Sequence, residues 1–487
     1  MAMNFPAIIK ILGFITVLIG GAMIPSVLVS VLYGEYHTAL MFTLIILPVL
    51  VMGIIVSRQI KVRVSKLKLR EGFCVVAFSW LLVSLIGCLP YLVTGTVDGF
   101  VNAFFEATSG FTTTGASIIT DVEIIPKGIL FWRSFCQWLG GMGILIFAIS
   151  ILPTLGISGQ RMAKAESPGV TLNKVVPRMA DSAKILYIIY VSFTLAAVVL
   201  LMLGGLNLFD AFIAALGCVA SGGLSNYNGG ISHFNSTYIE FIVTSFTVLA
   251  CINFTLYYSV IRGKWREFFS DQELRVFLLI LSCGGLFITA NLLATGSYDS
   301  VYRALRHGLF QASAFMTTTG HFSTDFDLWP AFSKMVLLLL MLIGASSSST
   351  GGGIKVIRIV MLFKILRRGV FMRLHPNAVV PIKIQGKTIS SEMVSGVMSF
   401  LALYTFIFML SGLILSLENL DFLTIITTVT ATLNNVGTGM ELVGPTGSFA
   451  LFSDFSKIYL CLLMLMGRLE LFTIILLFTP AFWNPDR

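Results

Sequence analysis

The stretch Phe111-Thr112-Thr113-Thr114-Gly115 recurs later in the chain as Met316-Thr317-Thr318-Thr319-Gly320. Two looser copies are Val219-Ala220-Ser221-Gly222, which is followed by Gly223, and Asn434-Asn435-Val436-Gly437. The copies are roughly 100 residues apart, and each lies between apolar segments long enough to cross a bilayer. Glycine adopts backbone angles that a Cβ forbids, so a polar loop ending in glycine can turn its carbonyls toward one axis. A ring of four such loops could replace the water around a dehydrated cation, which predicts a pore with four-fold pseudo-symmetry.

The composition indicates a polytopic membrane protein. Of the 487 residues, 56% are hydrophobic and 11% are charged, whereas about 25% of residues are charged in ordinary soluble domains. The seven cysteines are scattered singly through apolar segments, which favours buried free thiols over a metal or redox site. We expect no enzymatic activity, because the chain has no HExxH or GxSxG motif and no carboxylate pair at catalytic spacing.

Windows of about 20 apolar residues predict membrane crossings. Ten lie near residues 6–33, 38–57, 73–96, 129–154, 183–207, 238–261, 275–296, 331–365, 391–416 and 456–480. The first is too long for a signal-peptide core and the second follows it at once, so we expect both in the mature protein. They form an N-terminal hairpin with a basic cytoplasmic loop, residues 1–72, outside the repeats.

Basic residues are concentrated in alternate loops between these spans. They are Arg58, Lys61, Arg63, Lys66, Lys68 and Arg70; Arg161, Lys164, Lys174 and Arg178; Arg262, Lys264, Arg266 and Arg275; and Lys364, Arg367, Arg368, Arg373, Lys383 and Lys387. Because basic loops stay in the cytoplasm, the pattern predicts a multi-pass protein with cytoplasmic N and C termini. The net charge of +9 then serves membrane orientation and not nucleic-acid binding.

A short semi-polar segment precedes each glycine-ending motif. The four segments are Phe100 to Ser109, Leu208 to Cys218, Tyr302 to Phe315 and Phe422 to Leu433. They are too short to cross a bilayer and too apolar for plain loops, so we expect re-entrant pore helices whose negative dipole ends favour a cation at the motifs. The predicted fold is all-α, with parallel repeats of span, pore helix, filter and span at residues 73–160, 161–262, 263–388 and 389–487.

Packing of small residues between helices is the alternative explanation for these motifs. It is strongest for the second copy, where Val219 and Ala220 replace threonine. The shared place of all four copies in the repeat favours a filter. His321 directly follows the third filter glycine, where we expect an exposed residue at the pore mouth.

The eighth predicted span is interrupted by Gly344-Ala345-Ser346-Ser347-Ser348-Ser349-Thr350-Gly351-Gly352-Gly353, and Lys355 follows. These residues are poor helix formers, and the flanking runs Met335 to Ile343 and Ile354 to Leu366 are each too short to span alone. We therefore predict a broken helix with an intramembrane loop that gates the pore below the third filter. A flexible linker between helices is the alternative.

Arg468 lies near the middle of the tenth predicted span. A charge at that depth costs about 2.5–3.5 kcal/mol on insertion scales, so we expect it to face the pore or a partner. It is either an electrostatic barrier beneath the filter or half of a buried ion pair. Glu470, two residues later, points elsewhere on the helix.

These motifs resemble the Trk/Ktr/HKT superfamily of potassium transporters and are closest to its bacterial Trk branch. The resemblance covers essentially the whole chain. It rests on Phe104-Phe105-Glu106-Ala107-Thr108-Ser109-Gly110-Phe111-Thr112-Thr113-Thr114-Gly115, Gln137-Trp138-Leu139-Gly140-Gly141-Met142-Gly143, Ser349-Thr350-Gly351-Gly352-Gly353-Ile354-Lys355 and Gly467-Arg468-Leu469-Glu470. From the residues alone, interface anchoring and helix packing explain the second of these stretches.

The resemblance implies potassium uptake across the bacterial inner membrane, with K+ bound at the filter residues. It implies a homodimer in which each subunit has its own pore, and control by a cytoplasmic ring of TrkA-like nucleotide-binding subunits. It also implies that residues 344–353 are a gate and that Arg468 lies near it. The chain has no nucleotide-binding GxGxxG motif of its own on a soluble domain, and we expect no organic cofactor on it.

A coupled secondary transporter, with H+ or Na+ symport, is the alternative function. Coupling generally needs an intramembrane carboxylate or a second cation site, and Glu106 and Glu470 are the only nearby candidates.

Overall fold

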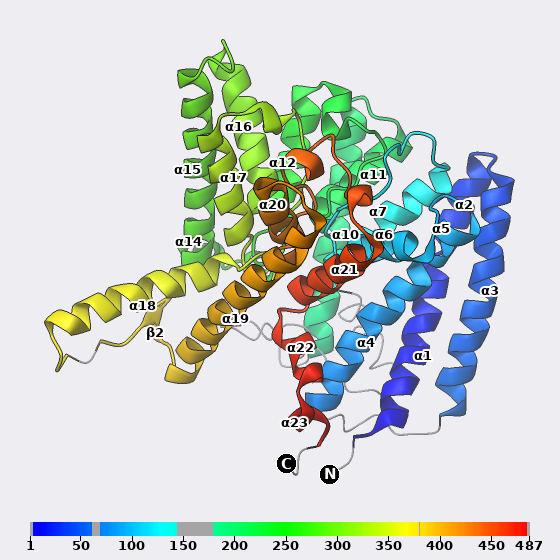
Figure 1. Ribbon diagram of the computed structural model, residues 1–487, viewed down its shortest axis with the longest axis horizontal. Helices are drawn as coiled ribbons and strands as arrows, with labels where there is room; N and C mark the ends of the chain where they lie inside the picture. The colour runs from blue at the N-terminus through cyan, green and yellow to red at the C-terminus, as the bar shows by residue number, and fades with distance from the viewer. Residues whose placement is uncertain (1–2, 61–68, 144–178, 379, 485–487) are drawn as a thin grey trace.

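The computed structural model describes residues 3–60, 69–143, 179–378 and 380–484, and these residues are mostly helical. Figure 1 shows the helices packed side by side, with α18 projecting from the body of the molecule. In the described part of the chain, strands β1 (Lys383–Ile384) and β2 (Lys387–Thr388) form a single small antiparallel hairpin. The fold is therefore that of a mostly helical, polytopic membrane protein.

The helices follow one another in an N-terminal group and four groups that each contain one glycine-ending motif. The N-terminal group is α1 (Phe5–Ala22), α2 (Ile24–Leu32) and α3 (Tyr36–Gln59). Around the first motif are α4 (Leu69–Gly87), α5 (Leu89–Val93), α6 (Phe100–Phe111) and α7 (Lys127–Gly141). Around the second are α10 (Met179–Leu203), α11 (Leu208–Ala220), the 3₁₀ helix η3 (Gly230–Phe234), α12 (Thr237–Ala250) and α13 (Phe254–Ile261).

The last two groups are longer. Around the third motif are α14 (Trp265–Ser270), α15 (Gln272–Ala294), α16 (Val301–Met316), η4 (Phe326–Leu328), α17 (Ala331–Ile343) and α18 (Val356–Leu374). Around the fourth are α19 (Ser391–Leu415), η5 (Ser416–Glu418), α20 (Phe422–Leu433), η6 (Glu441–Val443), η7 (Phe449–Leu451), α21 (Asp454–Arg468), α22 (Phe472–Ile475), η8 (Leu476–Phe478) and α23 (Pro480–Trp483).

Within the described residues, six helices are long and apolar enough to cross a bilayer, and two bent helix pairs raise the number to eight. Their outward faces suit lipid. On α3, for example, Leu40, Leu44, Leu47 and Val51 fall on one helical stripe and are 47% to 63% exposed. The predicted span at 129–154 begins in α7 and continues beyond residue 143, outside the described residues.

The four predicted short segments are helices, namely α6, α11, α16 and α20. They have 12, 13, 16 and 12 residues and cannot cross a bilayer. Capping side chains fix where two of them begin: Asn207 accepts a hydrogen bond from Asp210 N (2.9 Å) and Asp421 from Thr424 N (2.9 Å). Each helix ends directly at its motif.

The helix after each motif is short: α7, α12, α17 and α21 end after 13 to 15 residues. The break predicted within 331–365 is confirmed. The predicted spans at 238–261 and 456–480 are each bent, since α12 and α13 meet at 89° and the helical segments Asp454–Arg468 and Phe472–Phe478 meet at 115°. Asn253 starts α13 by accepting from Thr255 N (3.0 Å), and Glu470 and Leu471 have φ of +57° and +55°, which no α-helix contains.

Small residues allow close packing within the N-terminal hairpin and between the hairpin and the first group. A Cβ at Gly53 would collide with Val17 on α1, and one at Gly128 of α7 would collide with Ser30. Glu35, at the tip of the hairpin, accepts hydrogen bonds from the backbone of Lys127 (2.6 Å) and Gly128 (3.0 Å). The contacts of Glu35 and Ser30 attach the hairpin to the start of α7.

Candidate functional site

The four motifs share one backbone conformation. Just after each short helix comes a residue with left-handed φ: Thr113 (+56°), Ser221 (+54°), Thr318 (+57°) and Asn435 (+55°). Two residues later comes a glycine with positive φ: Gly115 (+83°), Gly223 (+75°), Gly320 (+69°) and Gly437 (+85°). Non-glycine residues adopt such angles rarely, so four matching pairs mark four copies of the same loop.

The residue between each pair is held by the same hydrogen bond. Its N–H donates to the carbonyl five residues earlier: Thr114 to Ser109 (2.9 Å), Gly222 to Gly217 (2.9 Å), Thr319 to Ala314 (2.9 Å) and Val436 to Ala431 (2.8 Å). This bond tightens the last turn of each short helix and directs the chain away from the helix axis.

This geometry corrects the register of the second motif. The prediction made Gly222 the counterpart of Gly115, but the backbone angles and hydrogen bonds give that place to Gly223. Gly222 instead stands where Thr114, Thr319 and Val436 stand in the other loops. Val219 therefore lies one position before the loop, inside α11.

The four loops close on one another in a ring. A Cβ at Gly115 would strike the carbonyl oxygen of Gly222, and one at Gly223 would strike that of Thr319. In the same way, Gly320 faces the carbonyl of Val436, and Gly437 faces that of Thr114. The loops thus touch in chain order, the fourth returning to the first, and glycine is required by both φ and space at each seam.

Almost all side chains of this ring are buried, and many are hydroxyls. The hydroxyls of Thr112 and Thr114 lie 2.7 Å apart, and those of Thr317 and Thr319 lie 3.0 Å apart. His321 is also buried, at 2% exposure, so the prediction of an exposed residue at that position is wrong. The imidazole packs beside Gly217 of α11, where a larger residue would meet it.

Arg468, at the end of α21, reaches the ring at its first loop. Its guanidinium donates to the hydroxyl of Thr113 (3.2 Å) and to the carbonyls of Thr350 (2.9 Å) and Gly141 (2.7 Å). It also donates to the carbonyl of Gly140 (2.5 Å). One positive charge therefore joins the first loop, the end of α7 and the segment between α17 and α18.

That segment, residues 344–355, is a compact loop against the break between α12 and α13. Ser346 N donates to Cys251 O (3.3 Å), and Thr350 donates through N (3.3 Å) and Oγ1 (3.1 Å) to Ala250 O. Phe254 N in turn donates to Ser348 O (3.1 Å). The predicted loop is thus packed against the protein, with Thr350 and Ser346 buried.

Charged residues surround this loop on its other side. Glu273, at the start of α15, accepts from Ser347 N (2.6 Å) and Ser347 Oγ (2.7 Å). Arg358 of α18 forms an ion pair with Glu470 and lies 4.0 Å from the ring centre of Phe400. Lys355 donates to the carbonyl of Gly351. Arg358 therefore joins α18 to the break after α21.

Residues 43–484 match the TrkH family of cation transport proteins. The chain belongs to this family. Among similar proteins, the Trk system potassium uptake protein TrkH of Salmonella typhimurium is 35% identical, over 99% of this chain and all of that protein. TrkG of Escherichia coli K12, another Trk system potassium uptake protein, is 34% identical, with 97% of each chain covered.

A crystal structure of the potassium transporter TrkH from Vibrio parahaemolyticus superposes on the fold with a TM-score of 0.89 and 35% sequence identity. The match covers 99% of this chain and all of that chain. The TrkH likeness therefore extends to the arrangement of the helices around the ring.

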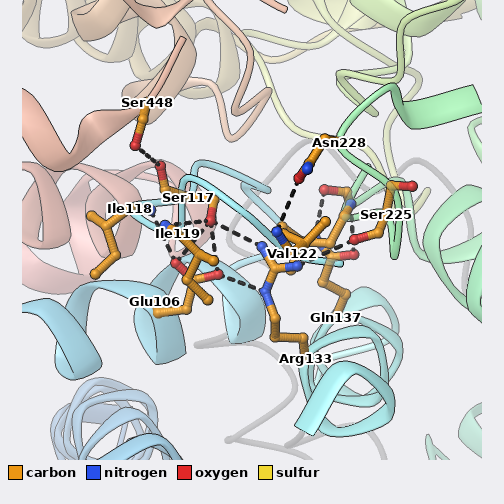
Figure 2. A network of polar contacts seen from close by, with 12 residues as sticks. Glu106, Ser117, Ile118, Ile119, Val122, Arg133, Gln137, Ser225, Asn228 and Ser448 are labelled. Carbon is orange, nitrogen blue, oxygen red and sulfur yellow. Dashed lines mark hydrogen bonds and ion pairs between the residues drawn. The ribbon is translucent and has the colours of Figure 1, made fainter. Parts of the chain in front are cut away.

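A buried ion pair supports the first TrkH-type loop from behind (Figure 2). Glu106 on α6 and Arg133 on α7 are 0% and 2% exposed and lie 2.7 Å apart. Glu106 also accepts from Ile118 N (3.1 Å) and from the hydroxyl of Ser117 (3.1 Å), just after the loop. Arg133 continues to Ser225 O (3.2 Å), after the second loop.

The other short helices hold their return segments with different side chains. Gln311 of α16 accepts from Ser323 N (3.2 Å), and Thr427 of α20 accepts from Met440 N (3.1 Å). Asp210 of α11 accepts from the side chains of Asn226 (2.5 Å) and Tyr227 (2.9 Å). One function, fixing the chain after the loop, is thus served by four different residue types.

Sequence reasoning missed this supporting layer. The sequence places Glu106 and Gln137 in stretches that carry the family resemblance, but it does not indicate that they support the loops. The supporting positions show no sequence repeat, because each repeat uses a different residue type there. The one available signal was charge: Glu106 and Arg133 are ionisable residues within apolar segments, and such residues are rarely buried without partners.

Proposed function

We propose that this protein takes up potassium through a selective pore whose filter is the ring of four loops. The closed ring carries the proposal, since four loops in chain order, each with a glycine at its seam, enclose one axis. The filter residues are Thr112, Thr113, Thr114 and Gly115; Ala220, Ser221, Gly222 and Gly223; Thr317, Thr318, Thr319 and Gly320; and Asn434, Asn435, Val436 and Gly437. The potassium named in the titles of the TrkH relatives supports this choice of ion.

The four short helices add an electrostatic reason for a cation. Each ends at its loop, so four helix C-termini meet at the ring. A helix C-terminus carries a partial negative charge, which favours a cation there. The repeats behind the ring, with their pseudo-four-fold arrangement, belong to the same proposal.

The proposal is tested by the flux of the purified protein in liposomes. We expect K+ to cross down its own gradient and Na+ to cross much more slowly. Equal K+ and Na+ fluxes would contradict a selective filter. If K+ flux requires an H+ or Na+ gradient, the protein is a coupled transporter and not a pore.

Two ion pairs favour the pore over the coupled transporter. Coupling needs a carboxylate that can bind and release the co-ion. Glu106 lies against Arg133 and Glu470 against Arg358, so both candidate carboxylates already have a positive partner. Breaking such a buried pair is strongly unfavourable, which suits a structural role better than a transport cycle.

We further propose that residues 344–355 and Arg468 form the gate. The loop donates from Gly352 N to the filter hydroxyl of Thr318 (2.6 Å), and Arg468 donates to Thr113. Both contacts lie on the inner side of the ring. A shift of α17 or α18 would move the loop, because it is the connection between them.

The proposed assembly is a homodimer in the bacterial inner membrane with a TrkA-like regulator on the cytoplasmic side. The projecting α18 supports this: Phe363, Leu366, Val370 and Leu374 form one exposed apolar stripe that a second copy could cover. Its basic residues and the hairpin at 383–388 would face the regulator. The start of α1 and the end of α23 lie on the same side of the molecule, as the proposed cytoplasmic termini require (Figure 1).

A further inference from the structure

The four loops are not braced in the same way. In the first loop, Thr112 donates to Thr108 O (2.7 Å) and contacts the hydroxyl of Thr114, so two side chains tie the loop to its own helix. The third loop repeats this with Thr317, which donates to Ser313 O (2.6 Å), and Thr319. These hydroxyl pairs restrain both loops internally.

The second loop has no such pair. Its equivalent positions are Ala220 and Gly222, which carry no hydroxyl. The fourth loop has Asn434 and Val436 there, and it is braced from outside, since Tyr404 of α19 donates to Asn434 (3.0 Å). Asn435 in addition donates to Met464 O (2.9 Å) of α21.

Gln137 of α7 supplies what the second loop lacks. Its amide nitrogen donates to Gly222 O (2.5 Å), and its amide oxygen accepts from Leu224 N (3.2 Å). The side chain is 0% exposed. Figure 2 shows Gln137 on the same helix as Arg133, next to the second loop. One amide therefore spans the peptides on both sides of Gly223.

Gln137 also fills the space of the missing threonine. A Cβ at Gly222 would collide with Cδ, Nε2 and Oε1 of Gln137. Gly222 stands where Thr114 and Thr319 stand, so the glutamine amide lies where their side chains would begin. The φ of Gly222 is not positive, so the backbone itself would admit threonine there.

We propose that Gln137 is a specificity-determining positioning residue, which replaces in the second loop the threonine side chains that brace the first and third. It holds the carbonyl of Gly222 at the seam with Gly115, so it controls the joint between two loops. Because it comes from the first repeat, it also ties the two repeats together. This inference rests on the proposed function of the ring as a potassium filter.

The test compares K+ and Na+ fluxes per folded molecule in liposomes. Gln137→Met fills nearly the same volume but makes neither hydrogen bond. We expect its K+ to Na+ flux ratio to fall about tenfold, in line with the loss of a typical hydrogen bond. Gln59→Met, at the exposed end of α3, is the matched control and should keep the wild-type ratio.

A rescue variant separates positioning from general stability. Gln137→Ala combined with Ala220→Ser and Gly222→Thr removes the amide and restores a hydroxyl pair in the vacated space. We expect this triple variant to recover the wild-type flux ratio, whereas Gln137→Ala alone does not. A purely structural glutamine would affect yield and thermal stability but would not be replaced by hydroxyls in the loop.

The outcomes are distinct. An unchanged ratio in Gln137→Met, or a triple variant no more selective than Gln137→Ala, would overturn the inference. If Gln137→Met does not fold, Gln137→Glu takes its place, since it keeps the shape and the acceptor for Leu224 N; a wild-type ratio there would overturn the inference too. If neither folds, the triple variant decides by its own ratio. A wild-type protein without K+ preference would instead refute the proposed filter.

Discussion

The hydroxyl of Thr318 accepts a hydrogen bond of 2.6 Å from the backbone N–H of Gly352. Thr318 is the left-handed residue of the third loop, and Gly352 belongs to the segment between α17 and α18. A Cβ at Gly352 would strike the carbonyl of Asn434 in the fourth loop. The segment therefore lies directly against two neighbouring loops of the ring.

Deleting Ser346 to Ser349 should raise the basal K+ flux and leave the K+ to Na+ ratio unchanged. The deletion shortens the connection that places Gly352 under the third loop, while the ring itself keeps all its residues. The measurement is flux into liposomes without any regulatory subunit, normalised to folded protein. Equal basal rates in both proteins would show that the segment does not obstruct the pore.

Gly320→Ser should lower the K+ to Na+ flux ratio in a protein that still folds. The substitution forces a side chain into left-handed backbone, at roughly 1–2 kcal/mol, and toward the carbonyl of Val436. Gly296→Ser is the control, because Gly296 has nearly the same φ (+68° against +69°) with open space around it. Loss of selectivity in both variants, or in neither, would contradict the assignment of Gly320 to the proposed filter.

Arg468→Ala should increase K+ flux per folded molecule and reduce the yield of folded protein. The guanidinium donates to four oxygens at the inner side of the ring, and each charged hydrogen bond contributes about 1.5–3 kcal/mol. Arg266→Ala, on the exposed α14, controls for general loss of charge. Normal yield with slower flux would contradict both the barrier and the structural role.

The segment around Asp327, which follows the third loop, should make stability depend on pH. Burial, helped by Asp325 and Glu441, raises the pKa of Asp327 from 3.8 to about 6. Between these values the folded protein binds more protons than the unfolded chain, so stability falls as pH rises from about 4 to 6. Asp327→Asn keeps an acceptor for Glu441 N and should flatten that part of the melting-temperature profile. The exposed Asp299→Asn should leave the profile as steep as in the wild type.

Neutralising Arg367, Arg368 and Arg373 to glutamine should weaken binding of a TrkA-like regulator by about tenfold, and the loss should shrink at high salt. These residues lie on α18, which projects from the protein (Figure 1). Arg262, Lys264 and Arg266, changed likewise to glutamine, remove the same charge from another exposed segment. Equal binding by both triple variants would mean that the α18 charges only orient the chain in the membrane.

The short helices and the interruption at 344–353 were predictable because composition marks them directly. The bends after Ala250 and Arg468 were not, since both segments are apolar enough on average for a hydropathy window to give one long span. Asn253 and Glu470 cause these bends by capping and by left-handed backbone. Isolated polar residues within an apolar run do not by themselves predict a bend.

The register of the second loop shows a different limit. Ser221-Gly222-Gly223 offers two glycines, and a motif comparison aligned the first with Gly115. The structure instead aligns Gly223 with Gly115. Gly222 is a glycine because Gln137, from the preceding repeat, occupies the place of its side chain. A local sequence motif does not indicate a contact between residues 85 positions apart. His321 is likewise buried by a residue far away in sequence, Gly217 of α11.

The closed ring has a consequence for synthesis of the protein. Its last seam joins Thr114 to Asn435, which are 321 positions apart, with a hydrogen bond of 3.0 Å between their side chains. The first loop is made early but lacks its neighbour until the final repeat has entered the bilayer and docked. Contacts so distant along the chain form late in folding. An unfinished chain, with three loops and an open side, therefore lacks the closed ring on which the proposed selectivity depends.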